Sequence, residues 1–190
     1  MASLNELISD VYVLTNRPDL VSETKLAVKK ATLKMHQSDF YAKDLWETGI
    51  SWNPVDYIQS LAYKNLNPLW RSLKYLRKYQ DGVPGAFFTV LSPEQSLDRY
   101  GVQKDDICYL AGDQIEIRSS TQDTYMLLGA YLNPNISDAN FSSWIADDHP
   151  YAIITDAAAS VFKTIGQDEK AAYFKQDVVE QIALLRQNNI

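Results

Sequence analysis

The sequence is poor in the residues on which metal sites and nucleophilic active sites are usually built. It has one cysteine and two histidines in 190 residues, and its seven glycines are scattered singly. His36 and His149 have no cysteine or carboxylate at a metal-ligand spacing, which argues against zinc. A glycine-rich phosphate loop and a Gly-x-Ser-x-Gly elbow are both missing. We therefore expect neither a metal nor a cofactor.

Long apolar runs are also missing. Charged or amide residues interrupt every apolar segment before it reaches the roughly 18 residues of a membrane span. The first six residues lack the basic start and apolar run of a secretion signal, and the single Cys108 cannot form a disulfide within the chain. These absences predict that the protein is made and kept in a reducing compartment.

The formal net charge of −6 is divided unevenly along the chain. Residues 1–80 carry 11 lysines and arginines against 8 carboxylates, whereas residues 81–190 carry 7 against 16. The acidic total and a pI near 4.9 argue against a nonspecific nucleic-acid binder. The division is either simple solvation or, in a homo-oligomer, a means of steering one subunit's basic half onto a neighbour's acidic half.

The first helix is predicted by its cap and by its apolar spacing. Ser3 and Glu6 have the form of a capping box, and Pro18 stops the helix after about Asn16. Apolar residues follow the cap at spacings of 3, 4 and 3: Leu4, Leu7, Val11 and Leu14. This stripe is expected to face the core.

A second helix is predicted from a Ser22 cap to about His36. One face carries small and apolar residues, and the other is rich in lysine. Two leucines interrupt the lysine side, where solvated residues are expected. Our candidates for a subunit contact are therefore Leu26, Leu33, Lys29 and Lys30.

Between residues 44 and 132 the period changes to two. Alternating and short apolar runs bounded by turn residues predict a small antiparallel sheet. The segment 69–79 fits a helix or a strand, and its aromatic content favours a strand. Three tryptophans of this region, Trp46, Trp52 and Trp70, are either core residues or stacking platforms for a glycan.

The chain is then predicted to close with two helices. Asp147 or Asp148 is expected to cap the first, with Pro150 in its first turn and Gly166 at its end. Its buried face is predicted to include Tyr151, Ile154, Ala158, Val161, Phe162 and Ile165. The last helix begins near Asp168. The predicted fold class is α+β: one mainly helical domain over residues 1–190, with a small β-rich insertion at 44–132.

No catalytic group is expected. Asp105 and Asp106 form an acidic pair, as do Asp147 and Asp148, but both pairs lie at element boundaries, where aspartate serves turns and caps. Cys108 lies in an apolar strand, where free cysteine acts as a small hydrophobe. His149 is expected to be a helix-start residue.

Several segments resemble the head-to-tail adaptor proteins of tailed bacteriophages, the group that includes tail tubular protein A. The segments are Leu97–Gly101, Tyr109–Asp113, Ile117–Ser119, Leu128–Pro134, Ser143–Ala146 and Ala157–Ser160. The order of elements is similar over nearly the whole chain. None of these segments is a chemical signature.

The resemblance implies a structural virion protein, made in the host cytoplasm and located in the neck between portal and tail. Proteins of this family form rings, commonly of twelve subunits, that dock on the portal, extend the DNA exit channel and present a platform to the tail or nozzle. Some relatives have a long C-terminal arm, whereas this chain ends just past its last helix, which puts docking through such an arm in doubt.

The last helix supplies the candidates for portal binding, which are Tyr173, Leu184, Arg186, Asn188 and Ile190. Tyr173 and Leu184 project away from the apolar stripe of that helix. They either bind the portal or pack against the sheet. Contact with genomic DNA is expected to be passive and independent of sequence, because few phosphates can be neutralised by an acidic chain. The alternative function is a small binding module, for example for glycans.

Overall fold

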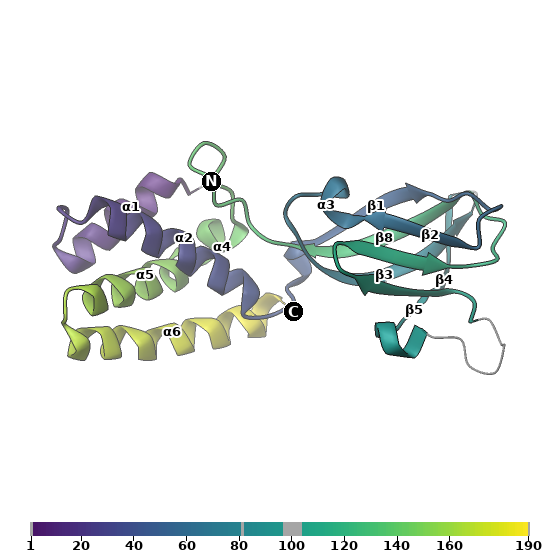
Figure 1. Cartoon of the computed structure of the whole chain (residues 1–190). Helices are drawn as coiled ribbons and strands as arrows, with labels where there is room; N and C mark the ends of the chain where they lie inside the picture. Colours follow the sequence, from purple (N-terminus) through teal and green to yellow (C-terminus); the bar gives the residue numbers. More distant parts are fainter. Residues whose placement is uncertain (1, 81, 97–103, 190) are drawn as a thin grey trace. The chain divides into compact units, whose positions relative to one another are not determined.

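The structure is a computed structural model that describes residues 2–80, 82–96 and 104–189 (Figure 1). The chain divides into two compact units. Met1–Asp44 and Asn133–Ile190 form a helical unit, and Leu45–Leu132 forms a β unit.

The fold class is α+β, but the prediction of a small sheet within a mainly helical domain is wrong. The structure is 45% helix and 28% strand, and the strands form two sheets of four. Alternation along the sequence marked the strands without showing which of them pair. The pairs include β1 (Leu45–Ser51) with β8 (Tyr125–Leu132), which are far apart in the chain.

The helical unit begins as the sequence predicted. In α1 (Leu4–Thr15), Ser3 Oγ accepts a hydrogen bond from the Glu6 amide at 3.2 Å, and the Glu6 carboxylate accepts one from the Ser3 amide at 2.7 Å. The capping box is thus confirmed. The Ser22 cap is wrong, because α2 (Val21–Gln37) starts two residues earlier, with Leu20 at the N-cap position and no side-chain cap.

The closing helices also differ from the prediction at their start. A short helix, α4 (Trp144–Asp148), precedes α5 (Pro150–Thr164), and the Ser143 side chain caps α4 by accepting from the Ala146 amide at 3.1 Å. Asp147 and Asp148 therefore end α4 and do not cap α5, whose N-cap is His149. After Gly166, at φ 74°, the chain enters α6 (Asp168–Asn189).

The core of the helical unit is built around α5, which packs against α1, α2, α4 and α6. Ten of its fifteen residues are buried, from Ala152 to Phe162. A helix that is apolar on most sides must be covered by neighbours on most sides. Stacked rings of Phe162 and Phe174, with centroids 5.5 Å apart, join α5 to α6.

The β unit contains the sheets β1-β8-β3-β4 and β2-β7-β6-β5. The remaining strands are β2 (Ile58–Ala62), β3 (Trp70–Gln80), β4 (Val83–Phe87), β5 (Thr89–Val90), β6 (Ile107–Ala111) and β7 (Gln114–Arg118), with a short helix α3 (Tyr63–Leu66) after β2. Neighbouring strands are antiparallel except for β5 and β6. The strand prediction for 69–79 is confirmed by β3.

One apolar cluster joins the two sheets face to face. It includes Leu76 and Leu128 from the first sheet and Cys108, Ile115 and Ile117 from the second, all nearly without exposure. The β unit is therefore a sandwich, in which each sheet buries one face and exposes the other.

Candidate functional site

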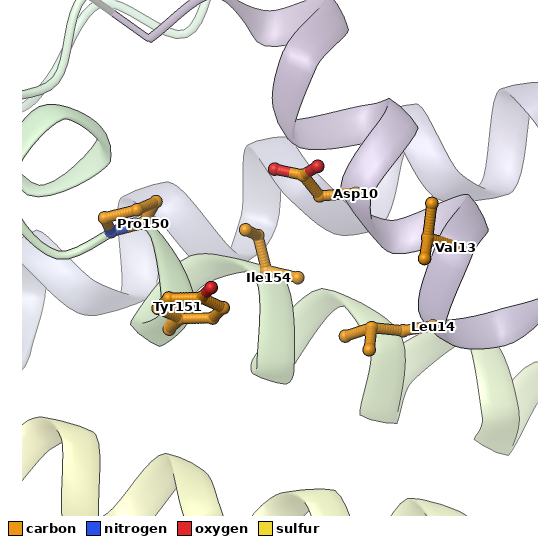
Figure 2. Close-up of a pocket in the computed structure, with 6 residues that line it drawn as sticks. All are labelled: Asp10, Val13, Leu14, Pro150, Tyr151 and Ile154. Atoms are coloured by element: carbon orange, nitrogen blue, oxygen red, sulfur yellow. The ribbon is translucent and has the colours of Figure 1, made fainter.

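Helices α1 and α5 border an apolar groove on the helical unit (Figure 2). It has a volume of about 290 Å³ and is lined by Asp10, Val13 and Leu14 from α1 and by Pro150, Tyr151 and Ile154 from α5. Val13 is 81% exposed, Tyr151 68% and Leu14 41%. Contiguous apolar exposure of this kind marks interaction sites more often than a single exposed leucine does.

Two of these residues were predicted to be in the core. The apolar spacing of α1 placed Leu14 on the buried stripe, and that of α5 placed Tyr151 there. In the structure Thr15 is buried instead at the end of α1, with Oγ1 donating to the Val11 carbonyl at 2.8 Å. The spacing correctly indicated an apolar face. Leu14 and Tyr151, at the ends of these apolar faces, are not covered by other parts of the described chain.

A second groove lies between α2 and α5, with a volume of about 310 Å³. It brings together Leu26 and Lys30, two of the residues predicted for a subunit contact, with Leu26 52% exposed. Glu23, Ala27, Ser160, Val161 and Thr164 complete its lining.

The other two predicted contact residues do not line this groove. Leu33 is half-buried. The Lys29 ammonium pairs with Asp138 at 2.5 Å, and Lys25 pairs with the same carboxylate at 2.6 Å. These ion pairs lower the pKa of Asp138, through hydrogen bonds from Lys25 and then Lys29.

The portal-binding candidates on α6 fall into three groups. Tyr173 and Leu184 are 64% and 47% exposed, on the outer side of the helix. Arg186 instead pairs with Asp39 at 2.9 Å and donates to the Ser38 carbonyl at 2.6 Å, so it ties the end of α6 to the end of α2. The side chain of Asn188 and residue Ile190 lie outside the described residues.

A buried polar cluster in the helical unit has the bonding pattern of a catalytic triad. His36 Nδ1 lies 2.7 Å from Asp44 Oδ1, and His36 Nε2 lies 2.9 Å from Ser143 Oγ. The Trp144 indole also donates to Asp44 Oδ1, at 2.8 Å. No motif could reveal this cluster, because His36 and Ser143 are 107 residues apart.

The surroundings make this cluster structural. His36 is 2% exposed and Ser143 6%, so the serine hydroxyl is not open to a substrate. Ser143 already caps α4, and the His36 and Tyr41 rings contact Trp144 edge to face. Every member therefore has a packing or hydrogen-bonding role in joining α2, the Asp44 segment and α4.

The β unit buries the tryptophans that were considered as glycan platforms. Trp52 and Trp70 are 4% and 6% exposed, and Trp46 is half-buried against the same core. These three rings are core residues of the sandwich.

The outer face of the first sheet combines aromatic and basic residues. Tyr75 lies opposite Gly129, where a Cβ would be only 2.5 Å from the tyrosine ring. On the same sheet Lys74 lies 5.6 Å from the Tyr131 ring, and Arg77 lies 4.9 Å from the Phe87 ring. Such cation–π contacts cover apolar surface with charge.

The acidic pairs and the cysteine have structural surroundings. The Asp105 carboxylate accepts from the Ser120 amide at 2.7 Å, and Asp106 pairs with Lys78 at 2.8 Å. Lys43 bonds Asp148 at 2.6 Å and so lowers its pKa. Burial raises the pKa of the Cys108 thiol to about 12, which makes it a poor nucleophile.

Over the part of the chain that the structure describes, no three His, Cys, Asp or Glu side chains are grouped as a metal site. No described helix is long and apolar enough to cross a membrane. The sequence matches no protein-family model, and it matches none of the curated proteins.

Proposed function

We propose that this protein is a ring-forming head-to-tail adaptor of a tailed bacteriophage. In this role it docks on the portal, extends the DNA exit channel and gives the tail or nozzle protein a platform. It acts as a structural virion protein and not as an enzyme. The observation that carries the proposal is the exposed apolar groove between α1 and α5, which calls for a protein partner.

Ring assembly requires two different surfaces on each subunit, because every copy contacts one neighbour on each side. The helical unit has such surfaces at different places on α5. One groove adjoins residues 150–154 and the other residues 160–164, which are about 15 Å apart along the helix. A third surface, on α6, leaves Tyr173 and Leu184 available for the portal.

The segments that resemble adaptor proteins also support the proposal, because several have framework roles. Ser143–Ala146 starts α4, Ala157–Ser160 lies in the central helix α5, and Leu128–Pro134 contains Gly129, which accommodates the Tyr75 ring. Leu97–Gly101 lies outside the described residues. The glycan-binding alternative loses support, because its three tryptophans lie in or against the sandwich core.

The test is to mix the protein with purified portal rings from the same phage and to weigh the complexes by native mass spectrometry. We expect the portal to gain a ring of copies, about twelve, while the isolated protein sediments as a monomer or weak oligomer. A portal that gains no mass would contradict the proposal. A stable ring of isolated protein at micromolar concentration would contradict assembly on the portal.

Portal binding through α6 is tested by Tyr173→Asp with Leu184→Asp. The matched control is Ala172→Asp with Ala183→Asp, because these alanines are also exposed on α6 and are also 11 residues apart. We expect only the first pair to weaken portal binding. Truncation at residue 186 is a poorer test, since it also removes the Arg186 anchor to Asp39.

A further inference from the structure

We infer that the α1/α5 groove of one copy is filled by α2 of a second copy, packed antiparallel to α1. This inference rests on the proposed ring and names the contact within it. In this contact Asp10 lies opposite Lys30, and Leu14 lies opposite Leu26.

The charges at the two grooves are complementary. Asp10 is exposed beside the α1/α5 groove, and Lys30 is exposed beside the α2/α5 groove. Among the described residues neither has an ion-pair partner within its own chain. Placing these charges together across a contact favours the correct register and disfavours others.

The spacing on the two helices also matches. Asp10 precedes Leu14 by four residues, whereas Leu26 precedes Lys30 by four. Residues four apart lie on one helical face, so reversing one helix brings acid to base and leucine to leucine at the same time.

The same register supplies a close fit between the two pairs. Val13, which is 81% exposed, comes opposite Ala27, a small residue in the lining of the α2/α5 groove. A small residue lets a neighbouring helix approach closely. Tyr151 stands beside the contact and can add to the buried area, of which a stable interface needs on the order of 1,000 Å².

A second copy is the occupant that these features favour, because both complementary surfaces are on this one chain. They are not the same surface, so the contact is head-to-tail and can repeat around a ring. An unrelated partner would have to supply both the leucine and the lysine at this spacing.

Charge reversal tests the contact on the portal. Asp10→Lys alone and Lys30→Asp alone each place like charges together, and we expect each to raise the concentration needed for ring assembly at least about tenfold. The double variant Asp10→Lys with Lys30→Asp should restore assembly, as should an equimolar mixture of the two single variants, in alternating order. Assembly of both single variants at the wild-type concentration would overturn the inference while leaving the adaptor function intact.

A cross-linking test works without the portal. Purified Leu14→Cys and Leu26→Cys proteins, differently tagged, are mixed at high concentration and oxidised; Cys108 is buried and does not interfere. We expect a disulfide between the two tags, and none when Ala172→Cys replaces Leu26→Cys. A disulfide with no mass gained by the portal would support the contact and contradict the adaptor. Absence of the disulfide in rings that do form on the portal would overturn the contact alone.

Discussion

Two tyrosines, Tyr131 in the β unit and Tyr151 in the helical unit, differ in how their rings are covered. In the β unit Tyr131 is only 6% exposed, and Arg71 and Lys74 lie over its ring. In the helical unit Tyr151 remains 68% exposed beside Val13, within an apolar groove. Cations of the β unit therefore cover Tyr131, although other apolar side chains of that unit, such as Phe87 at 60%, stay exposed. In the helical unit, Tyr151 and Val13 have no such cover from the described residues and stay exposed in the groove.

The interiors of the two units differ in how many polar groups they bury together. The helical unit buries His36, Asp44 and Ser143 in one hydrogen-bonded cluster, whereas the core cluster of the sandwich is apolar apart from the Cys108 thiol and the indole nitrogens of Trp52 and Trp70. A buried polar cluster specifies one packing arrangement, but losing one member leaves the other polar groups unpaired and destabilises the fold. An apolar core is more tolerant, and its sensitive points are places of close approach.

The largest effect is expected from Asp44→Ala. The substitution removes the acceptor Asp44 Oδ1 from the buried His36 ring and from the half-buried Trp144 indole, so we expect the free energy of unfolding to fall by about 3 kcal/mol. Urea denaturation measures it. Asp148→Ala is the control, because its ion pair with Lys43 is exposed to solvent and should contribute little to stability. Equal losses for both would mean that the cluster is not a stabilising element.

Gly129→Ala probes the close approach in the β unit. The added methyl group would clash with the Tyr75 ring, which must then swing away from its contact with Phe87, so we expect a loss of about 1–2 kcal/mol. Gly49→Ala on the neighbouring β1 strand is the control, since its Cβ meets nothing within 4 Å. The prediction is wrong if both variants unfold at the same urea concentration.

The sequence predicted local features of the fold better than long-range ones. The α1 cap and the β3 strand depend on neighbouring residues and were predicted. Pairing of β1 with β8, and of His36 with Ser143, joins distant parts of the chain and leaves no periodic signal. The size of the two sheets was therefore underestimated, and the polar cluster was missed.

The sequence predicted only some residues of the candidate site. An exposed Leu26 could be recognised because lysines surround it on α2. Leu14 and Tyr151 were assigned to the core, because apolar spacing shows that a helix face needs covering without showing which molecule covers it. The residues for which that prediction failed are the ones that line the proposed subunit contact.

A smaller effect is expected from Asp138, which joins the loop before α4 to Lys25 and Lys29. Its pKa is lowered in the folded state. The stabilisation is therefore present above the ordinary aspartate pKa and is lost as the pH falls through the lowered value. Asp138→Asn should flatten the fall in melting temperature below about pH 4. Unchanged acid dependence would show that these ion pairs do not stabilise the folded state.

The smallest effect expected is on DNA binding, and it compares the basic residues of the β unit with those of the helical unit. Strand β3 carries Arg71, Lys74, Arg77 and Lys78 with no carboxylate between them, yet the chain as a whole has a net charge of −6. At about 0.15 M salt we expect no electrophoretic shift of duplex DNA, because too few phosphates are neutralised to outweigh the acidic total.

At low salt any weak binding should use the outer face of the first sheet. Lys74→Glu with Arg77→Glu should abolish that binding, whereas Lys163→Glu with Lys175→Glu, the same change in net charge on the helical unit, should reduce it less. Equal loss from both pairs would mean that only net charge matters, and a sequence-dependent shift at physiological salt would overturn passive contact altogether.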